Sequence, residues 1–521
     1  MTRAVSDVAA GYWHDALYDP VGTLLDGVER RNIKEGEPGE PVKFKAYRGL
    51  PRLALAPPAL TLAPAGAPHP ALSTFLYYSY GVHRHDPEPG GWPYHRMVPS
   101  ARCFFPTELY VALPSEGGLG DGVHYYDPMH HALVRLRAGD HCAAVADATG
   151  ADLSGAAAVV VLSSMFWKTA FRYRDYAYRL CSQEAGIVAG NVLLVAEALG
   201  WEAHVHFLFR DRSLNRLLGL REPAENAFAV LALYPRGPGR PLRPAPPGAG
   251  DAAEALPELH TVHPQPSTYD PAAVPVLTRV SRAGFMAGTG SPVRGTGIAP
   301  ALPAGIDGSH LVPVPDGVEA GDLAQVLRAR DSGPGYLDFL PGEVPAEAVW
   351  RIARAVARPY TCDVAAPSGT AVADCYLVVR SVAGIAEGIY RVRPGSPALQ
   401  AVYVGAVPAV LREISMTDTA MATVNFVKAP LTAFVAVPGG TAVDGLGARG
   451  FRILNQVAGM AAQWICVASA RSGLTARVHN GYSAKAAEQR LGLAGTGARV
   501  LFQIAIGAGR PGSALRLPVA F

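Results

Sequence analysis

The sequence predicts an α+β protein made of two tandem α/β sandwich domains that pair within one chain as an intramolecular pseudo-dimer. Three observations predict this fold. The chain has 521 residues, which is too long for one ordinary hydrophobic core. A proline-rich stretch, Pro235 to Pro275, divides it nearly in half and disfavours long helices and central strands. The two halves also repeat one order of strands and a long apolar helix, which indicates a duplicated unit.

The first repeated segment is a pair of strands. Residues 99–127 read PSARCFFPTELYVALPSEGGLGDGVHYYD, and residues 367–393 read PSGTAVADCYLVVRSVAGIAEGIYRVR. Each copy opens with a Pro-Ser turn, enters an apolar run of strand-forming residues and returns through a Gly-rich connection to a second strand. The offset between the copies stays nearly constant, which favours duplication over coincidence.

The second repeated segment is a long helix. RLCSQEAGIVAGNVLLVAEALG begins at Arg179 and RILNQVAGMAAQWICVASARSG begins at Arg452, an offset of 273 residues. Small and apolar residues recur at helical spacing in both, so we expect both helices to be buried. A strand, a short helix and a last strand follow each one. The pattern predicts domain 1 at residues 1–240, a linker at 241–275 and domain 2 at 276–521.

The composition excludes several classes of function. Apolar residues make up 49% of the chain and charged residues 17%, as in globular proteins. The formal net charge of +3 comes from scattered arginines and does not favour nucleic-acid binding. No apolar run approaches the roughly 20 residues that span a bilayer, and the N-terminal residues do not form a secretory signal. We expect a cytoplasmic protein with reduced cysteines that binds neither membrane nor nucleic acid.

Two further patterns are interpreted as structural. The histidines at 124, 130, 131 and 141 lack a carboxylate at metal-binding spacing, so we expect them in strands and turns, and we expect no metal. The segment GTGSPVRGTG, which begins at Gly288, lacks the Lys-Ser/Thr pair of a phosphate-binding loop. We interpret it as an ordinary loop.

The ordered motifs of the first half resemble a known family. LYYSYG at 76–81, PSARCFFPTELYVAL with GVHYYDPMHHAL after it, and the segment that begins FRYRDYAYRL at Phe171 resemble the SagB-type (McbC-like) dehydrogenases, a branch of the FMN-dependent nitroreductase superfamily. The resemblance covers residues 70–235 directly and 275–510 only through the repeat. It implies two nitroreductase-like domains, FMN as cofactor, and oxidation of thiazoline or oxazoline rings in a ribosomally made peptide to thiazoles or oxazoles.

The resemblance also implies partners. These are an azoline-containing precursor peptide and, as a second candidate, the cyclodehydratase of the same pathway. Fused tandem members of the family occur in thiopeptide biosynthesis, which favours that pathway class. Two alternatives stay open: a general flavin reductase or nitroreductase with a nicotinamide donor and a small-molecule substrate, and a flavin-free scaffold in a peptide-modifying complex.

The catalytic candidates are Arg172 and Tyr173, which occupy the positions of the family's Lys-Tyr pair. Dehydrogenation removes a proton from carbon and transfers a hydride to flavin, so an acid-base group must face the substrate. The Arg172 guanidinium stays protonated and is a poor base, which makes Tyr173 the preferred catalyst. Lys168, one helical turn earlier, is a further candidate amine. A structural role, such as pairing of Arg172 with Asp175, is the alternative.

The cofactor-binding candidates come from both halves. Pro99 and Ser100 are expected to form a turn whose N–H groups meet the flavin's pyrimidine oxygens; Arg102 stands where the family commonly has Gly. Three residues of the first long helix line the flavin pocket or are satisfied by neighbouring chain: Glu184, Gly186 and Asn191. In RVSRAGF the second half offers a phosphate cradle, with a plain loop or helix cap as the alternative: Arg279, Ser281 and Arg282.

The second half lacks the groups proposed for chemistry in the first. The 273-residue offset gives these replacements: Leu446 for Tyr173, Gly445 for Arg172, Val457 for Glu184 and Trp464 for Asn191. Aliphatic side chains cannot exchange protons. We therefore interpret the second half as a degenerate partner that completes a single site, and we expect one FMN per chain.

Overall fold

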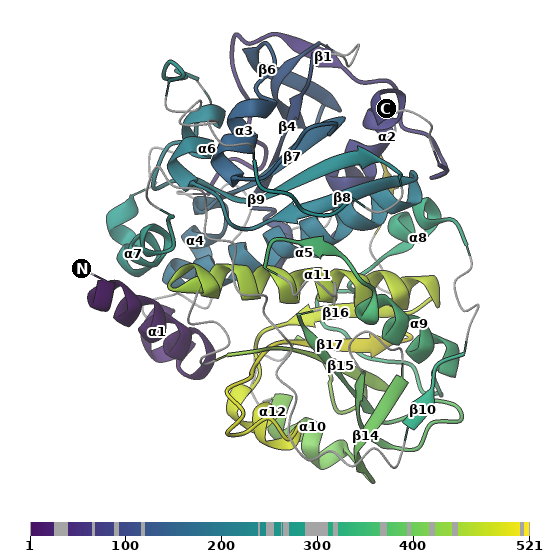
Figure 1. Cartoon of the computed structure of the whole chain (residues 1–521). Helices are drawn as coiled ribbons and strands as arrows, with labels where there is room; N and C mark the ends of the chain where they lie inside the picture. The colour runs from purple at the N-terminus through teal and green to yellow at the C-terminus, as the bar shows by residue number, and fades with distance from the viewer. Residues whose placement is uncertain are drawn as a thin grey trace.

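Two large sheets lie on opposite sides of two long helices in the computed structural model of the chain (Figure 1). The helices, α5 (Ala177–Ala198) and α11 (Arg449–Arg471), run side by side through the middle of the molecule. The structure describes residues 2–25, 40–64, 68–87, 93–115, 120–237, 240–245, 255–261, 263, 270–286, 311–315, 321–364, 372–392, 398–415, 423–439, 446–510 and 515–519.

The first sheet takes all but one of its strands from the first half of the chain. Its order is β1 (Arg52–Ala54), β6 (Ala132–Ala138), β5 (Gly122–Asp127), β4 (Thr107–Leu113), β7 (Ala158–Met165), β9 (Glu225–Pro235), β8 (Trp201–His206) and β11 (Thr361–Cys362). Neighbours are antiparallel except β8 and β11. Every residue of β4, β5 and β7 is buried, because helices cover both faces. They are α3 (Cys142–Thr149) and α6 (Asp211–Leu218) on one face, and α2 (Pro68–Tyr80) and α5 on the other.

The second sheet repeats this order of strands. It runs β10 (Leu311–Pro313), β14 (Ala398–Val404), β13 (Gly388–Val392), β12 (Asp374–Val379), β15 (Leu431–Val437), β17 (Arg499–Gly507) and β16 (Thr475–His479), all antiparallel. From β14 to β16 the strands follow the chain order that β6 to β8 show in the first sheet. The helices of this half are α8 (Leu323–Ala329), α9 (Ala346–Ala357), α10 (Pro408–Ser415), α11 and α12 (Ala484–Arg490). The predicted mixed α/β architecture is confirmed.

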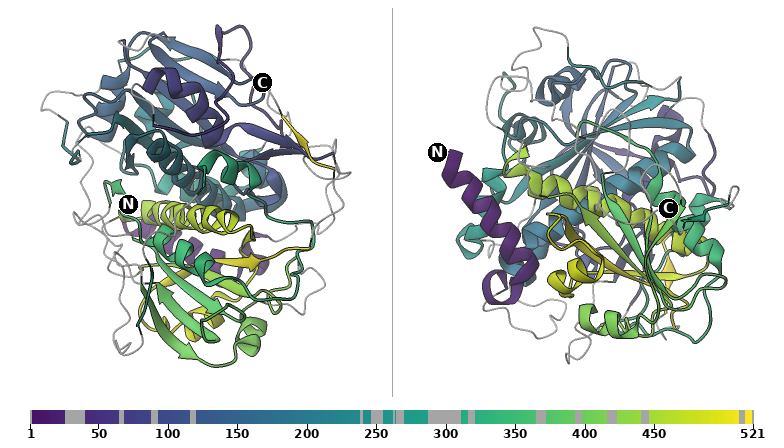
Figure 2. Two further views of the ribbon diagram at one scale, coloured as in Figure 1. Left: turned by 90° about the vertical axis from the view of Figure 1, so that its right-hand side faces the viewer. Right: turned by 60° about the horizontal axis from the view of Figure 1, so that its bottom comes forward.

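Three segments connect the halves by crossing between them. Strand β11 of the second half extends the first sheet, and β18 (Leu517–Pro518) pairs with β2 (Val82–His85), which pairs with β3 (Tyr94–Arg96). The N-terminal helix α1 (Thr2–Tyr18) runs along one side of the molecule (Figure 2). Its Tyr12 hydroxyl donates to Asp175 O at 2.8 Å, and its Tyr18 hydroxyl donates to Glu488 Oε1 at 2.9 Å. The helix therefore contacts both halves.

The contacts around α5 and α11 are reciprocal. Gln183 on α5 donates through Nε2 to Leu501 O on β17 at 3.2 Å, and Gln456 on α11 donates through Nε2 to Phe228 O on β9 at 2.9 Å. Each residue of the first contact is separated from its counterpart in the second by 273 positions, the offset of the sequence repeat. Two copies of one contact thus hold each long helix to the sheet of the other half.

One glycine on each helix lies directly against the backbone of the other helix. A Cβ added at Gly186 would lie 2.0 Å from Gln456 O, and a Cβ added at Gly459 would lie 2.2 Å from Gln183 O. Such distances are far inside van der Waals contact, so a larger residue fits only if a backbone moves. The two glycines are also 273 positions apart, which is the offset of the sequence repeat.

A buried ion cluster joins α6 of the first half to α11. Asp211 pairs with Arg449 Nη1 at 2.5 Å and with Arg452 Nη2 at 2.9 Å. Arg449 also donates to the carbonyl oxygens of Phe207 and Gly284. Burial, and next the neighbouring Arg452, lower the pKa of Arg449 to about 10. Asp211 therefore pairs with two guanidinium groups inside the protein.

The two long helices are buried, as predicted. By length and composition alone α11 could cross a membrane, with a mean hydropathy of 1.2, but 94% of that window is buried inside the protein. This burial is typical of the core helix of a folded domain.

The described parts of the proline-rich stretch pack on the first half. Pro257 O accepts from Arg137 Nη2 at 2.9 Å, and Leu256 O accepts from Arg216 Nε at 2.8 Å. The domain boundaries stay predictions. The second Pro-Ser turn at 367–368, the segment that begins at Gly288, and Gly445 lie outside the described residues.

The six cysteines are free thiols. The four discounted histidines lie in β5, in the turn before β6 and just before α3. Within the described ranges, no three His, Cys, Asp or Glu side chains come together as metal ligands would.

Candidate active site

The loop from Pro99 to Phe105 lies between β3 and β4 and contains the single turn η2 (Ala101–Cys103). Arg102, Cys103 and Phe105 have φ angles of 52°, 58° and 47°, in the left-handed region that favours glycine. Strained backbone of this kind is found mainly at functional sites. The φ of Arg102 also explains why glycine suits this position in the resembling family. Its side chain is exposed.

Glu184 on α5 holds this loop through hydrogen bonds. Ser100 Oγ donates to Glu184 Oε2, and the Tyr80 hydroxyl donates to Oε1 at 3.1 Å. The same Ser100 Oγ accepts the Phe105 N–H at 3.0 Å, and Thr107 N lies 3.5 Å from Oε1. Burial raises the pKa of Glu184 to about 7, against the opposing effect of Ser100 and Tyr80. Two of the predicted cofactor residues, Ser100 and Glu184, are thus in direct contact.

Arg96 lies beside this group and was not anticipated from the sequence. Its guanidinium carbon is 3.9 Å from the centroid of the Tyr80 ring and 5.0 Å from that of Phe105. The side chain is 1% exposed, and its Nε has no hydrogen-bond partner among the described residues. A cation at this place lowers the pKa of Glu184, although burial outweighs it.

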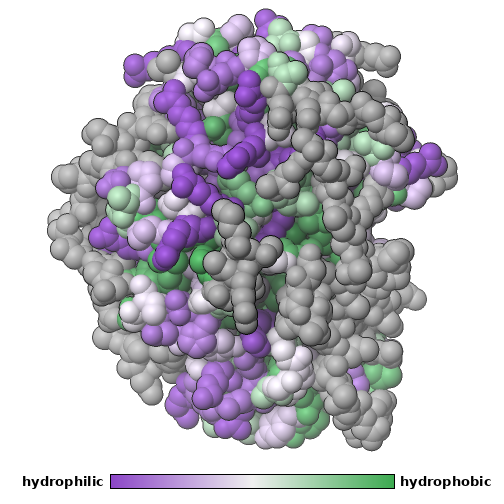
Figure 3. Space-filling model, turned by 60° about the vertical axis from the view of Figure 1, so that its left-hand side comes forward, coloured by the Kyte–Doolittle hydropathy of each residue, from purple (hydrophilic) through white to green (hydrophobic). Residues whose placement is uncertain are grey.

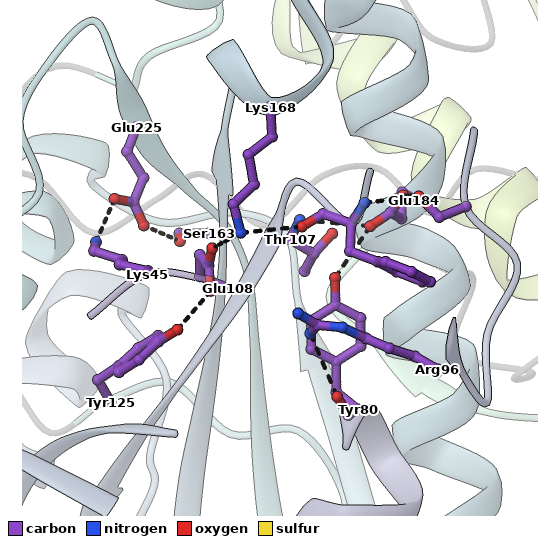
Figure 4. A network of polar contacts seen from close by, with 12 residues as sticks. Lys45, Tyr80, Arg96, Thr107, Glu108, Tyr125, Ser163, Lys168, Glu184 and Glu225 are labelled. Atoms are coloured by element: carbon purple, nitrogen blue, oxygen red, sulfur yellow. Dashed lines mark hydrogen bonds and ion pairs between the residues drawn. The ribbon is translucent and has the colours of Figure 1, made fainter. Parts of the chain in front are cut away.

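Two buried lysine–glutamate pairs continue the polar network across the first sheet (Figure 4). Lys168 Nζ lies 2.5 Å from Glu108 Oε1 and 3.4 Å from Phe105 O. Lys45 Nζ lies 2.5 Å from Glu225 Oε2. Burial lowers the pKa of Lys168 even though Glu108 opposes it. Lys168 therefore donates to the backbone carbonyl of Phe105 in the loop, and the Glu108 carboxylate on β4 balances its charge.

Arg172 and Tyr173 end helix α4 (Trp167–Tyr173), which packs beside the loop. The ring of Phe104 lies 5.0 Å from that of Phe171 and 6.4 Å from that of Tyr173, measured between centroids. Tyr173 is partly exposed, whereas Arg172 is 8% exposed and is engaged within the protein. The structure thus brings Tyr173 to the loop that carries Pro99 and Ser100.

The turn after Tyr173, η3 (Arg174–Tyr176), is fixed by two helices. Tyr12 on α1 donates to the carbonyl oxygen of Asp175, and Leu277 N–H on α7 (Pro275–Ala283) donates to Asp175 Oδ1 at 2.7 Å. The carboxylate of Asp175 therefore caps α7. Figure 3 shows the side of the molecule toward which α1 and α7 lie, where hydrophobic patches alternate with hydrophilic residues.

Helix α7 carries the predicted phosphate cradle. Arg279 and Arg282 are exposed, whereas Ser281 is buried and its Oγ accepts a hydrogen bond from Asn226 Nδ2 at 2.9 Å. The helix packs against α1, η3 and α5. The three residues lie near the turn that follows Tyr173, and their role toward phosphate stays a prediction.

Gly186 and Asn191 make packing contacts. Gly186 faces the backbone of α11, and Asn191 Nδ2 donates to Tyr78 O and Ser79 O, each at 2.8 Å. Asn191 Oδ1 accepts from Gln463 Nε2 at 3.0 Å. These are the contacts that the structural alternative predicts, a buried residue satisfied by neighbouring chain.

A group of polar and mostly charged side chains between the loop and the second half was missed from the sequence. Arg330 Nε donates to Met97 O at 3.0 Å, Arg477 Nε donates to Ser332 O at 2.8 Å, and Cys103 Sγ lies 3.6 Å from His95 Nδ1. We call this group the junction cluster, with the members Arg84, Asp86, His95, Cys103, Arg330, Asp331, Arg477 and Arg516.

The junction cluster has an excess of positive charge. Four arginines face only two aspartates, Asp86 and Asp331. Burial lowers the pKa of His95 to about 4, so this imidazole adds no charge at neutral pH. The sequence signal was the run Arg330-Asp331-Ser332, which directly follows α8.

Comparison with known proteins places the chain in a family. A model of the nitroreductase family matches residues 72–233. A candidate nitroreductase from Methanocaldococcus jannaschii is 31% identical over 153 residues, which cover 29% of this chain and 74% of that protein. The chain belongs to the nitroreductase family.

Two further proteins are similar to this chain. The microcin B17-processing protein McbC of Escherichia coli is 26% identical over 141 residues, or 26% of this chain and 51% of McbC. A solved structure of a candidate nitroreductase from Anabaena variabilis superposes with a TM-score of 0.71 at 19% identity, covering 96% of this chain and 99% of that chain. The second likeness shows that the two chains share a fold over nearly their whole lengths.

The residues at the loop fit the flavin mononucleotide that the family implies. A phosphate needs cations, and the junction cluster has an excess of them. A ring system needs aromatic or apolar neighbours and hydrogen-bond groups, and the loop offers Phe104, the adjacent Tyr173 and backbone in the left-handed conformation. The unpartnered Nε of Arg96 is a further buried donor.

Proposed function

We propose that this nitroreductase-family protein is an FMN-dependent dehydrogenase that oxidises thiazoline or oxazoline rings of a ribosomally made peptide. The observation that carries the proposal is the packing of Tyr173 against the loop whose Ser100 is held by Glu184. The similarity to McbC, a protein that processes microcin B17, supports a peptide as the substrate. A precursor peptide and its cyclodehydratase are the partners that this function requires.

We further propose that the two halves form an intramolecular pseudo-dimer with a single shared site. The equal strand orders support this, as do the reciprocal glutamine and glycine contacts of α5 and α11. An isologous interface within one chain also requires no second subunit. We expect the protein to be a monomer of 54.7 kDa.

FMN would be held by groups from both halves. Backbone groups of the Pro99–Phe105 loop would face its ring, and its phosphate would be held either by Arg330 of the junction cluster or by the α7 cradle. When bound, the flavin supplies the acceptor for a hydride. Arg330→Ala and Arg279→Ala separate the two phosphate sites, because only the correct one lowers the flavin content of purified protein.

The chain's own residues supply the proton chemistry. The Tyr173 hydroxyl would hold or transfer the proton that leaves the ring carbon, and it is the only acid-base group among the predicted catalytic residues that is partly exposed. Arg172 stays protonated and stabilises negative charge that develops beside it. Lys168, buried and paired with Glu108, would support the loop through Phe105 O.

A general nitroreductase with a nicotinamide donor is the second candidate. The match to the M. jannaschii protein favours it, because that sequence is the more similar of the two relatives. Co-expression with an azoline-containing peptide decides between them. The proposal requires that each ring lose two hydrogens, detected by mass spectrometry; bleaching of bound flavin by NADH without ring oxidation would support the alternative.

The shared-site proposal predicts one FMN per chain. Flavin released by denaturation and counted by absorbance against protein should approach equal molar amounts. Two flavins per chain would show that the second half also forms a complete site, and a colourless protein would favour the scaffold alternative.

A further inference from the structure

We propose that ionised Glu184 holds the Pro99–Phe105 loop in its left-handed conformation, and that uptake of a proton by Glu184 releases the loop. This makes Glu184 a positioning residue. The inference deepens the proposed function, because that loop is the flavin-facing segment, but the loop can be observed without flavin or substrate.

The hydrogen-bond geometry carries the argument. The carboxylate accepts from Ser100 and Tyr80, with the N–H of Thr107 at the limit of contact. An ionised carboxylate is an acceptor only, so it suits this set of donors. Ser100 can then donate to Glu184 and accept the Phe105 N–H at the same time. The carboxylate is thereby linked to the far end of the loop.

A proton on either oxygen disturbs this set. On Oε2 it points at Ser100 Oγ, which already accepts from Phe105, so the serine hydroxyl must find another acceptor. On Oε1 it opposes the Tyr80 hydroxyl. At least one of the donor contacts is lost or reversed in each case. Fewer hydrogen bonds then hold Arg102, Cys103 and Phe105 in their strained left-handed conformation, so the loop can leave it.

The groups around Glu184 determine its pKa. Tyr80 comes from α2, Arg96 from β3, Cys103 from the loop and Cys181 from α5 itself. Strand β4 contributes the Thr107 N–H, and α11 contributes the neutral Gln456 beside Gly186. Arg96 is thus the one cation in this set, and its lowering effect on the pKa of Glu184 is smaller than the raising effect of burial. The resulting pKa of about 7 means that Glu184 takes up its proton near neutral pH.

The same residue has opposite effects on the loop and on the whole fold. Because the pKa of folded Glu184 is raised from 4.5 to about 7, its contribution to stability is complete below pH 4.5 and is lost as the pH rises through about 7. Glu184→Gln removes a buried charge, so it should raise the denaturation midpoint at pH 8.5 while it loosens the loop. A merely structural glutamate would lower that midpoint when replaced.

Hydrogen exchange measured by mass spectrometry on peptides spanning 99–107 tests the proposal in the full-length protein. After correction for intrinsic rates, wild-type exchange should slow between pH 5.5 and pH 8.5, because only about one carboxyl in 30 is ionised at 1.5 units below its pKa. Glu184→Gln and Ser100→Ala should exchange fast at both pH values.

Glu197→Gln is the matched control, since Glu197 lies on the same helix with a 57% exposed side chain and should behave as wild type. Exchange of the wild-type loop that does not change with pH, or a Glu184→Gln loop as protected as wild type at pH 8.5, would overturn the proposal. Neither result depends on azoline oxidation, so failure of the proposed function is detected separately.

Discussion

The two central helices keep the same interface but differ at the site. Gln183 and Gln456 make equivalent contacts, and Gly186 and Gly459 occupy equivalent positions. In contrast, Glu184 holds the Pro99–Phe105 loop, whereas its counterpart Val457 belongs to the hydrophobic core.

The same contrast appears further along each helix. Asn191 hydrogen-bonds the end of α2, and its counterpart Trp464 donates through Nε1 to Gly190 O at 3.1 Å. The glutamine and glycine contacts between the two helices are therefore shared, whereas the residues at the positions of Glu184 and Asn191 differ. Packing and chemistry are separable in this fold, and substitutions can test each one alone.

The largest effect is expected where the halves differ in chemistry. Tyr173→Phe should lose about 10² to 10⁴ in the rate of azoline oxidation, because general acid-base groups contribute this much, while flavin content stays unchanged. Tyr403→Phe, at a 45% exposed site in the second half, is the control and should keep full activity. Turnover of Tyr173→Phe near the wild-type rate would exclude Tyr173 as the catalyst.

Variants of Arg172 test whether positive charge beside Tyr173 is needed for catalysis. Arg172→Ala should be slow, and Arg172→Lys should retain more activity if positive charge is what this position supplies. Equal rates for the two variants would show that the charge of Arg172 is not used. Steady-state kinetics at saturating peptide distinguishes these outcomes.

The next effect concerns the ion cluster that joins the halves. Asp211→Asn should lower the free energy of unfolding by about 3–5 kcal/mol, because it removes the carboxylate that pairs directly with the buried Arg449 and Arg452. Glu413→Gln breaks an exposed pair with Arg490 and should cost about 0–1 kcal/mol. Urea denaturation measures both free energies of unfolding. Equal losses in the two variants would show that Asp211 is not essential to the contact between α6 and α11.

The smallest effect tests the reciprocity of the helix contact. Gly186→Ala and Gly459→Ala should each destabilise by about 1–3 kcal/mol through overpacking, and by similar amounts. Because both report on one contact, their effects should not add in the double variant. Gly11→Ala on α1, where a Cβ meets nothing within 4 Å, should be neutral or slightly stabilising. Unequal losses would break the symmetry between the halves.

Much of the fold could be predicted from the sequence. Periodicity marks a buried helix wherever it occurs, and the repeated order of strands and helices appears in the chain itself, so α5, α11 and the paired strands were identified with their offset. The positions of Ser100, Glu184 and Tyr173 near one another followed only from a family resemblance, since they are far apart in the chain. Nothing in local pattern revealed Arg96 or the partners of Lys168.

The sequence by itself therefore determined the elements, their repeated order along the chain and the difference between Glu184 and Val457, because these depend on residue type and spacing. Only the tertiary structure decided that Gly186 serves the contact with α11, that Asp211 pairs with two arginines of the other half, and that Arg330 and Arg477 lie beside Cys103. Such contacts join residues that are hundreds of positions apart, and burial gives them their energies. No local sequence pattern encodes either the distance between them or the exclusion of water around them.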